Sequence, residues 1–237
     1  MIAVDAGSNQ VSVLRIRPGG SLRLVSHGVV SSGGLLPDSV AVSGDLVYLA
    51  NSGAGGSNYT GFRLRPNGRL DPIPAQGLGP FGSEFRSADP GQLFVSNAHN
   101  TATDSDTVSA FTDSADGTLS PVAGSPFADG QMAPCWVEIT HDGQFLFTVN
   151  TASGTISRFS IAPDCVLTLL GSTPAGQAGG VGAVDARLSP DGGFLYVDES
   201  RIGKVGAFTV RGGNLTELSS SPTALPAGAT PAGIVVN

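Results

Sequence analysis

Hydrophobic and polar residues alternate in short segments along the whole chain, and turns rich in glycine, proline and aspartate join the segments. Alternation with a period of two residues indicates half-buried β-strands. One phrase, a turn followed by a leucine, occurs five times at spacings of 48, 49, 48 and 48 residues. The five copies end at Leu22, Leu70, Leu119, Leu167 and Leu215. This periodicity predicts a repeat protein.

Each repeat shows the pattern of up to four strands, here named A to D in chain order. Strand C precedes the turn phrase, as in VSVLRI at residues 11–16 and ISRFSI at 156–161, and strand D follows it. Strand B comes earlier and ends in a polar residue. Strand A begins four of the units, near residues 37–42, 80–85, 134–139 and 184–189. Four antiparallel strands in about 48 residues are typical of a propeller blade.

We therefore expect an all-β fold, a β-propeller of five four-stranded blades that forms a single domain over residues 1–237. The first unit lacks strand A, whereas residues 230–237 (TPAGIVVN) read as a strand A with no B, C or D after it. If this C-terminal strand pairs with the strand that starts at Ile2, it completes the first blade and removes exposed sheet edges. The alternative is a fragment of a seven-bladed propeller.

Charge and composition narrow the classes of partner. The formal net charge is −7, and the lysines and arginines are scattered singly along the sequence, so we expect no nucleic acid and no membrane as partners. No apolar run approaches the roughly 20 residues that span a bilayer, and no export signal precedes the first strand. Cys135 and Cys165 fall in different parts of a blade and are expected to be free thiols. Together these features favour a cytoplasmic protein.

Polar residues on the inner A strands are the first candidates for a site, because these strands and their loops line the mouth of a propeller channel. One set of repeat-equivalent positions carries three charges, at Glu84, Glu138 and Arg187. We predict catalytic acid or base roles for the two glutamates and a carboxylate-binding role for Arg187, which also counts among the catalytic set. Trp136 and Asp185, two positions earlier in their repeats, are predicted to bind substrate. The competing interpretation is an ion pair that satisfies itself inside a narrow channel.

The last residue of strand B is polar in all five repeats: Asp5, Asn51, Asn97, Asn150 and Glu199. Asparagine and aspartate often bond nearby backbone in turns, so most of this ring is expected to be structural. Glu199 departs from the pattern and is predicted as a further catalytic residue. Arg201 and the loop residue His99, which titrates near neutrality, are predicted to bind substrate. For His99, a solvated loop histidine is the simpler interpretation.

Sequence motifs of other enzyme classes are missing. The sequence contains no G-x-S-x-G, H-E-x-x-H or P-loop motif, and the glycine-rich residues 176–184 open no helix. The three histidines are dispersed, which disfavours a metal centre. We therefore expect neither a metal nor a cofactor.

The phrases APCWVEITHDGQFLFTVNTASGTISRFSI and LSPDGGFLYVDES, with VDAGSNQVSVLRI near the start, resemble the lactonase family of β-propellers. That family includes propeller-type 6-phosphogluconolactonases and carboxy-cis,cis-muconate cyclases, and its members normally have seven blades. The resemblance implies metal-independent hydrolysis of a lactone, or the related cyclisation in which a carboxylate adds to a double bond. Such chemistry uses Arg, His and Glu side chains at the channel mouth. Matching residue types here are Glu84, Glu138, Arg187, Glu199, Arg201 and His99.

Two functions from different classes stay open. The first is a lactonase, or a lactone-forming cyclase or isomerase, that acts on a small carboxylate or lactone. The second is a non-catalytic scaffold propeller whose longer loops, at residues 53–60 and 99–107, bind a ligand or a protein. The charged inner ring favours the enzyme, because a scaffold has little need of three charges at repeat-equivalent positions.

Overall fold

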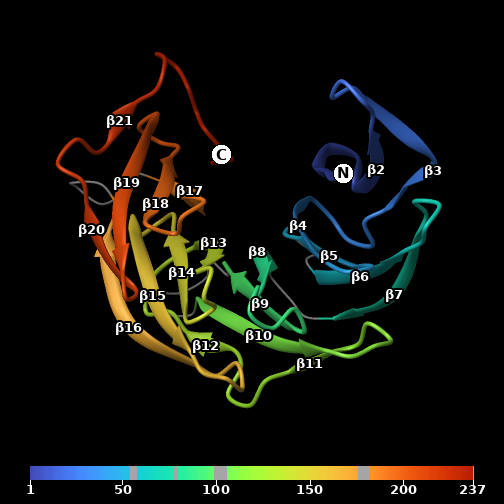
Figure 1. The fold of residues 1–237 in the computed structure, drawn as a ribbon, viewed down its shortest axis with the longest axis horizontal. Coiled ribbons are helices and arrows are strands. Elements are labelled where there is room, and N and C mark those ends of the chain that lie inside the picture. Colours follow the sequence, from blue (N-terminus) through green and yellow to red (C-terminus); the bar gives the residue numbers. More distant parts are fainter. Residues whose placement is uncertain (54–57, 77–79, 99–105, 176–181, 237) are drawn as a thin grey trace.

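The computed structural model describes residues 1–53, 58–76, 80–98, 106–175 and 182–236. Within them the strands form five antiparallel sheets, which follow one another around an open arc in chain order (Figure 1). A short 3-10 turn, η1 (Ala6–Ser8), joins the first two strands. The predicted all-β propeller fold is confirmed, while its extent as a single domain over residues 1–237 stays a prediction.

The first two sheets contain the N-terminal strands. The first sheet consists of β1 (Ile2–Asp5), β2 (Gln10–Ile16) and β3 (Leu22–Ser31). The second consists of β4 (Pro37–Ser43), β5 (Leu46–Asn51), β6 (Asn58–Leu64) and β7 (Leu70–Gln76). Their order in space is their order in the chain, because short turns join antiparallel neighbours.

The remaining sheets repeat this plan. The third contains β8 (Pro80–Phe85), β9 (Gln92–Asn97), β10 (Thr107–Asp113), β11 (Leu119–Pro121) and β12 (Phe127–Ala128). The fourth contains β13 (Pro134–Ile139), β14 (Phe145–Asn150), β15 (Thr155–Ile161) and β16 (Leu167–Pro174). The fifth contains β17 (Ala183–Leu188), β18 (Phe194–Glu199), β19 (Lys204–Arg211), β20 (Asn214–Glu217) and β21 (Thr223–Ala224).

Strand D is broken into two pieces in the third and fifth sheets, where β11 and β12 both pair with β10, and β20 and β21 both pair with β19. A serine hydroxyl replaces the missing ladder at each break. The amide of Ala110 donates to Ser125 Oγ at 3.0 Å, and the amide of Ala207 donates to Ser221 Oγ at 2.9 Å. The two serine hydroxyls therefore accept the backbone amides of strand C that face the break in strand D.

The core lies between neighbouring sheets and is divided into four clusters of buried apolar side chains. The alternating pattern of each strand accounts for this division, since it directs every second side chain to one face. Phe94, Phe147, Phe159 and Phe208 are almost fully buried in these clusters, and burial of one such ring contributes roughly 2–3 kcal/mol. Packing between sheets therefore sets the angle at which one blade follows another.

The pairing expected between the C-terminal strand and the first blade is not formed. In the described residues β1 pairs only with β2, and residues 225–236 contain no strand. The C-terminal segment lies beside the fifth sheet, where the amide of Ile234 donates to Asp185 Oδ2 at 2.9 Å. Side-chain packing fixes the rotation from each sheet to the next, and four such rotations leave the first and fifth sheets at opposite ends of the arc (Figure 1). The alternative of a larger ring fits this geometry better than a closed ring of five.

Candidate active site on the inner strands

The inner strands lie side by side, with β13 between β8 and β17. Most of them begin with a β-bulge that shifts the register with the next strand. In β13 the bulge lies between Pro134 and Trp136, and in β4 it lies between Pro37 and Ser39. Bulges re-aim side chains and occur often beside active sites. The direction of the side chains at the start of each inner strand is therefore set by a local feature that the repeats share.

The approach of β8 to β13 depends on a glycine. Gly82 occupies the position in β8 that Trp136 occupies in β13, and an added Cβ would lie 2.7 Å from Trp136 Cα and 2.8 Å from the Cys135 carbonyl oxygen. Contacts this short with backbone atoms require the strands to move apart. Glycine at this position thus brings the side chains of the two strands close together.

An ion pair lies at the centre of the cluster. Arg187 Nη1 in β17 donates to Glu138 Oε2 in β13 at 2.7 Å, and the amide of Leu188 donates to Glu138 Oε1 at 2.8 Å. The Arg187 guanidinium carbon lies 5.0 Å from the centre of the Trp136 ring, which is a cation–π contact. The Glu138 side chain is 7% exposed and that of Arg187 36%. The guanidinium is therefore the part of the pair that a ligand reaches first.

Glu84 of β8 adds a second carboxyl group. Its Oε2 accepts the amide of Ile139 at 2.8 Å. Burial, followed by the nearby charge of Glu138, raises the pKa of Glu84 well above its usual range, while Arg187 acts in the opposite direction. Burial also raises the pKa of Glu138, and Arg187 opposes that shift. The arrangement therefore favours a proton on Glu84 beside an ionised Glu138 that pairs with Arg187.

The carboxylates also join successive inner strands. Glu84 of β8 accepts an amide of β13, and Glu138 of β13 accepts an amide of β17. Asp185 of β17 accepts the amide of Ile234 in the C-terminal segment, as well as the amide of its own neighbour Ala186 at 2.7 Å. Glu84 and Glu138 thus each hold the next strand in place, and Asp185 holds the C-terminal segment, so part of the role of this cluster is structural.

The structure brings together the five residues predicted from the inner strands: Glu84, Glu138, Arg187, Trp136 and Asp185. Arg201, another predicted residue, lies elsewhere. Its side chain packs over Gly182, which directly precedes β17, and makes no hydrogen bond to the cluster in the described residues. His99 lies outside the described residues, as do residues 54–57 and 99–105 of the two longer loops.

Glu199, the remaining predicted catalytic residue, is fully buried at the end of β18. Neither of its carboxyl oxygens has a hydrogen-bond partner in the described part of the chain. Burial, then the charge of Glu217, raises its pKa to about 6, and Lys204 opposes the shift. Its carboxyl fills space beside Gly206, where an added Cβ would lie 2.8 Å from Oε1. Glu199 is thus separate from the inner cluster.

The equivalent asparagines make the structural contacts expected of them. The Asn97 amide donates to Thr107 Oγ1 at 3.0 Å and to Ser109 Oγ at 2.8 Å. The Asn150 amide bonds Thr155 and Ser157 in the same way, at 3.1 and 2.8 Å. In the fifth sheet, Lys204 and Gly206 stand at the positions of these two hydroxyl residues. An asparagine would therefore lack its hydroxyl partners there, and the residue at its position is Glu199.

Two carboxyl groups near the inner strands were missed by the sequence analysis. Asp38 lies at the bulge of β4, and burial raises its pKa to about 7. Asp198 of β18 accepts the amide of Asp185 at 2.9 Å, and burial raises its pKa to about 6. The repeat offers a signal for Asp38, because Asp38 and Cys135 both follow the proline that begins an inner strand.

Neither a metal site nor a reactive thiol was found among the described residues. No group of three or more His, Cys, Asp or Glu side chains able to hold a metal ion occurs there. Cys135 and Cys165 are both buried and free. Burial raises the pKa of Cys135 to about 11, so its thiol is a poor nucleophile at neutral pH.

No described helix has the length and apolar character to cross a membrane.

The fold and the inner cluster define a propeller with buried acids and an arginine beside its central axis. Residues 85–231 match the family described as "Lactonase, 7-bladed beta-propeller", and this match covers more than half of the chain. The chain belongs to this lactonase family, which confirms the resemblance seen in the sequence. No curated protein sequence matches the chain.

Solved structures show the same fold. A candidate 6-phosphogluconolactonase from Bacteroides uniformis is 23% identical with a TM-score of 0.78, over 94% of this chain and 67% of that one. The periplasmic gluconolactonase PpgL of Pseudomonas aeruginosa is 25% identical with a TM-score of 0.73, over 95% and 67%. A streptogramin B lyase is 18% identical with a TM-score of 0.62, over 98% and 67%. Because proteins with such different names share the fold, chemistry has to be argued from the site.

Proposed function

We propose that this protein hydrolyses a small lactone, without a metal ion, at the cluster of Glu84, Glu138 and Arg187. The observation that carries the proposal is the pairing of a partly exposed guanidinium with two buried carboxyl groups whose pKa values are raised to different extents. Carboxyl groups pushed apart in this way take acid and base roles. Membership of the lactonase family supports the choice of a lactone.

The first step is the addition of water to the lactone carbonyl carbon. Ionised Glu138 accepts a proton from the water as the new C–O bond forms. Arg187 uses only one N–H on Glu138, so its other N–H groups are available to the carbonyl oxygen as negative charge develops there. Trp136, against which the guanidinium packs, supplies an apolar wall for the lactone ring.

The second step opens the ring. The bond from the carbonyl carbon to the ring oxygen breaks, and protonated Glu84 gives its proton to the leaving oxygen. The product is a hydroxy acid. Return of the proton from Glu138 to Glu84 restores the starting state, so water and lactone balance the product. In the cyclase alternative, a carboxylate oxygen of the substrate, held by Arg187, would bond to one carbon of the double bond, and protonated Glu84 would give its proton to the neighbouring carbon.

The test is a kinetic comparison of matched variants on a panel of γ- and δ-lactones of sugar acids, followed by release of acid in a pH-stat. Glu138→Gln keeps an oxygen for the Leu188 amide but removes the base, and kcat is expected to fall at least tenfold. Glu217→Gln makes the same chemical change on outer strand β20 and is expected to keep wild-type turnover. Arg187→Lys keeps the charge but loses the planar fork, and a fall in kcat is expected for it as well.

The outcomes separate the alternatives. Wild-type turnover in Glu138→Gln would remove this cluster from catalysis. Activity that appears only with unsaturated dicarboxylates, seen as loss of their ultraviolet absorbance, would favour the cyclase. Tight binding of a ligand without turnover would favour the scaffold. Turnover that persists after dialysis against EDTA is expected if no metal takes part.

We also propose a reducing, cytoplasmic location, which the two buried free cysteines support. The similar structure of PpgL is described as periplasmic, so the compartment needs its own test. Fractionation of cells that express the protein at its natural level is expected to place it with cytoplasmic markers. Recovery with periplasmic markers would contradict this.

A further inference from the structure

The outer strands of the first two sheets gather positive charge in an otherwise acidic protein. Residues 1–71 contain six arginines and four acids, whereas residues 72–237 contain six basic residues and fifteen acids. Along the sequence these arginines stand singly, without a run of basic residues. Antiparallel pairing and the packing of the first sheet on the second bring several of them together.

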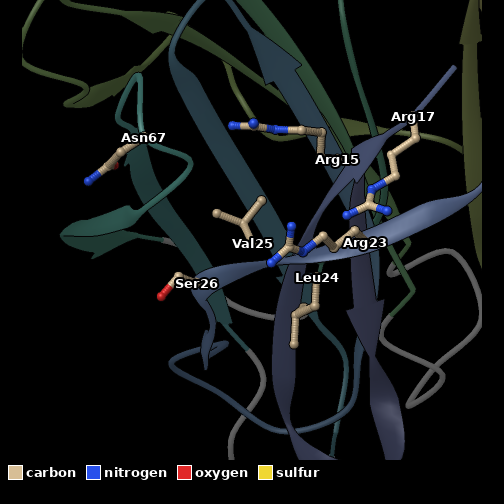
Figure 2. A pocket seen from close by; sticks show the side chains of 7 residues that line it. All are labelled: Arg15, Arg17, Arg23, Leu24, Val25, Ser26 and Asn67. Carbon is tan, nitrogen blue, oxygen red and sulfur yellow. The ribbon is translucent and has the colours of Figure 1, made fainter.

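Three arginines line one groove between these sheets, here called the arginine groove: Arg15, Arg17 and Arg23 (Figure 2). Arg15 of β2 and Arg23 of β3 are direct partners in the strand register. Arg17 follows the end of β2 and lines the same groove. Like charges directly opposite one another destabilise a sheet. An anion bound between the guanidinium groups would offset this cost.

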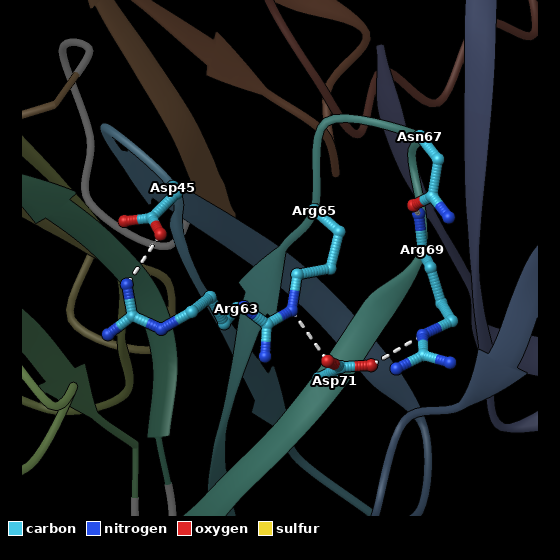
Figure 3. Close-up of polar contacts among 6 residues, drawn as sticks. All are labelled: Asp45, Arg63, Arg65, Asn67, Arg69 and Asp71. Atoms are coloured by element: carbon cyan, nitrogen blue, oxygen red, sulfur yellow. Dashed lines mark hydrogen bonds and ion pairs between the residues drawn. The ribbon is translucent and has the colours of Figure 1, made fainter.

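Nearby acids do not supply that balance. Asp45 pairs with Arg63, while Asp71 accepts both Arg65 Nε and Arg69 Nε at 2.6 Å (Figure 3). In the described residues no acid or hydrogen-bond acceptor pairs with the three guanidinium groups of the arginine groove. Each of the neighbouring arginines therefore has a carboxylate partner, whereas the arginines of the arginine groove have none in the described residues.

The arginine groove also has the size and lining of a small-molecule site. It encloses a cavity of about 310 Å³. Asn67, from the turn between β6 and β7, lies on its far side, and Val25 of β3 gives it an apolar part. Val25 in turn packs on Gly68, where an added Cβ would lie 2.7 Å from Val25 Cγ1. The groove is thus formed by two sheets packed against each other.

We propose that the arginine groove binds a phosphate group, either free or carried by a small molecule. A phosphate has several acceptor oxygens and nearly two negative charges at neutral pH, and planar guanidinium groups bind such oxygens in pairs. Three guanidinium groups match this charge and number of acceptors. The groove lies on outer strands, so this site is independent of the function proposed for the inner strands.

The test is calorimetric titration at pH 7.5 with two probes, inorganic phosphate and glycerol 3-phosphate, at constant ionic strength. Arg23→Gln is expected to weaken binding of phosphate about tenfold, since one charged contact is lost. Arg211→Gln makes the same change on β19 of the fifth sheet and is expected to bind as the wild type does. Binding is expected to weaken below pH 6, because phosphate then loses its second charge while arginine does not titrate.

Tighter binding of glycerol 3-phosphate than of inorganic phosphate would identify an ester as the ligand, and the reverse order would identify free phosphate. Equal losses in Arg23→Gln and Arg211→Gln would overturn the proposal, because they would show nonspecific attraction. Tighter binding of citrate than of either phosphate probe would also overturn it, in favour of a carboxylate site. Because Arg23 is exposed, the Arg23→Gln variant is expected to keep the wild-type fold. A thermal melt of each variant checks this.

Discussion

The inner cluster and the arginine groove are both groups of charged side chains, but they satisfy charge in different ways. On the inner strands the carboxylate of Glu138 is 7% exposed and is bound by Arg187 and by a backbone amide. On the outer strands Arg15 and Arg23 are exposed and face each other without an acid. A buried group that stays ionised needs an internal partner, whereas solvent screens exposed charges enough for their partner to be a ligand.

This contrast separates two kinds of site. In the inner cluster, the groups proposed to do chemistry also hold β8, β13 and β17 together, so function and stability are coupled there. In the arginine groove the arginines are exposed, so removal of a charge is expected to leave the packing of the sheets unchanged. Mutations should therefore affect stability strongly in the first region and weakly in the second.

The largest difference is expected from loss of one charged side chain in each region. Glu138→Ala leaves the Leu188 amide and the Arg187 cation without their acceptor, and the free energy of unfolding is expected to fall by about 4 kcal/mol. Arg15→Ala removes one of two facing like charges and is expected to change it by no more than about 0.5 kcal/mol. Urea denaturation monitored by the fluorescence of Trp136 measures both. Similar losses in the two variants would contradict the contrast.

A slightly smaller effect is expected from crowding of the inner strands. Gly82→Ala places a methyl group against the backbone of β13, and the free energy of unfolding is expected to fall by about 3 kcal/mol. Gly7→Ala is the matched control, because an added Cβ there meets no atom within 4 Å. The same denaturation experiment compares the two. A loss below about 1 kcal/mol in Gly82→Ala would show that β8 and β13 separate easily.

The third effect depends on pH. Burial raises the pKa of Asp38 to about 7, above its value of about 3.9 in an unfolded chain. The folded state binds this proton more tightly, so stability linked to Asp38 is lost as pH rises from about 4 to about 7. Asp38→Asn is expected to be as stable as the wild type near pH 4 and more stable by on the order of 2 kcal/mol at pH 5.5, and the difference is expected to grow until the pH passes about 7.

The control for this pH effect is Asp164→Asn, at an exposed turn residue. Its stability is expected to follow the wild-type curve between pH 4 and pH 8. Thermal melts at several pH values measure both variants. Parallel curves for Asp38→Asn and the wild type would show that the Asp38 carboxyl is hydrated in the folded protein.

Much of the fold could be predicted from the sequence because propeller blades are local. Strands B, C and D of each unit are joined by short turns, and the turn phrases with glycine mark where each hairpin reverses. The repeat also identified Glu84, Glu138 and Arg187 as equivalent positions on adjacent inner strands. Equivalent positions on adjacent strands lie close together in any propeller, so the cluster could be predicted without knowledge of the ring size.

Closure of the arc could not be predicted in this way. The complementary ends of the chain suggested a ring of five, but the angle between sheets depends on packing in the four apolar clusters and on contacts such as that of Gly82 with Trp136. Those contacts join residues about 50 positions apart, and small differences in each add up around the arc. The sequence repeat counts the units, and it carries no measure of that angle.

The sequence by itself determined the strands, their order and the inner ring of charges, because alternation, turn residues and the period of 48 residues act over short distances. Tertiary structure alone decided the partners of those charges. It gave Glu138 an amide of the next sheet and placed Ile234 on Asp185. Hydrogen bonds and charge contacts depend on distances of a few ångströms between segments, and only the packed arrangement of the sheets sets those distances.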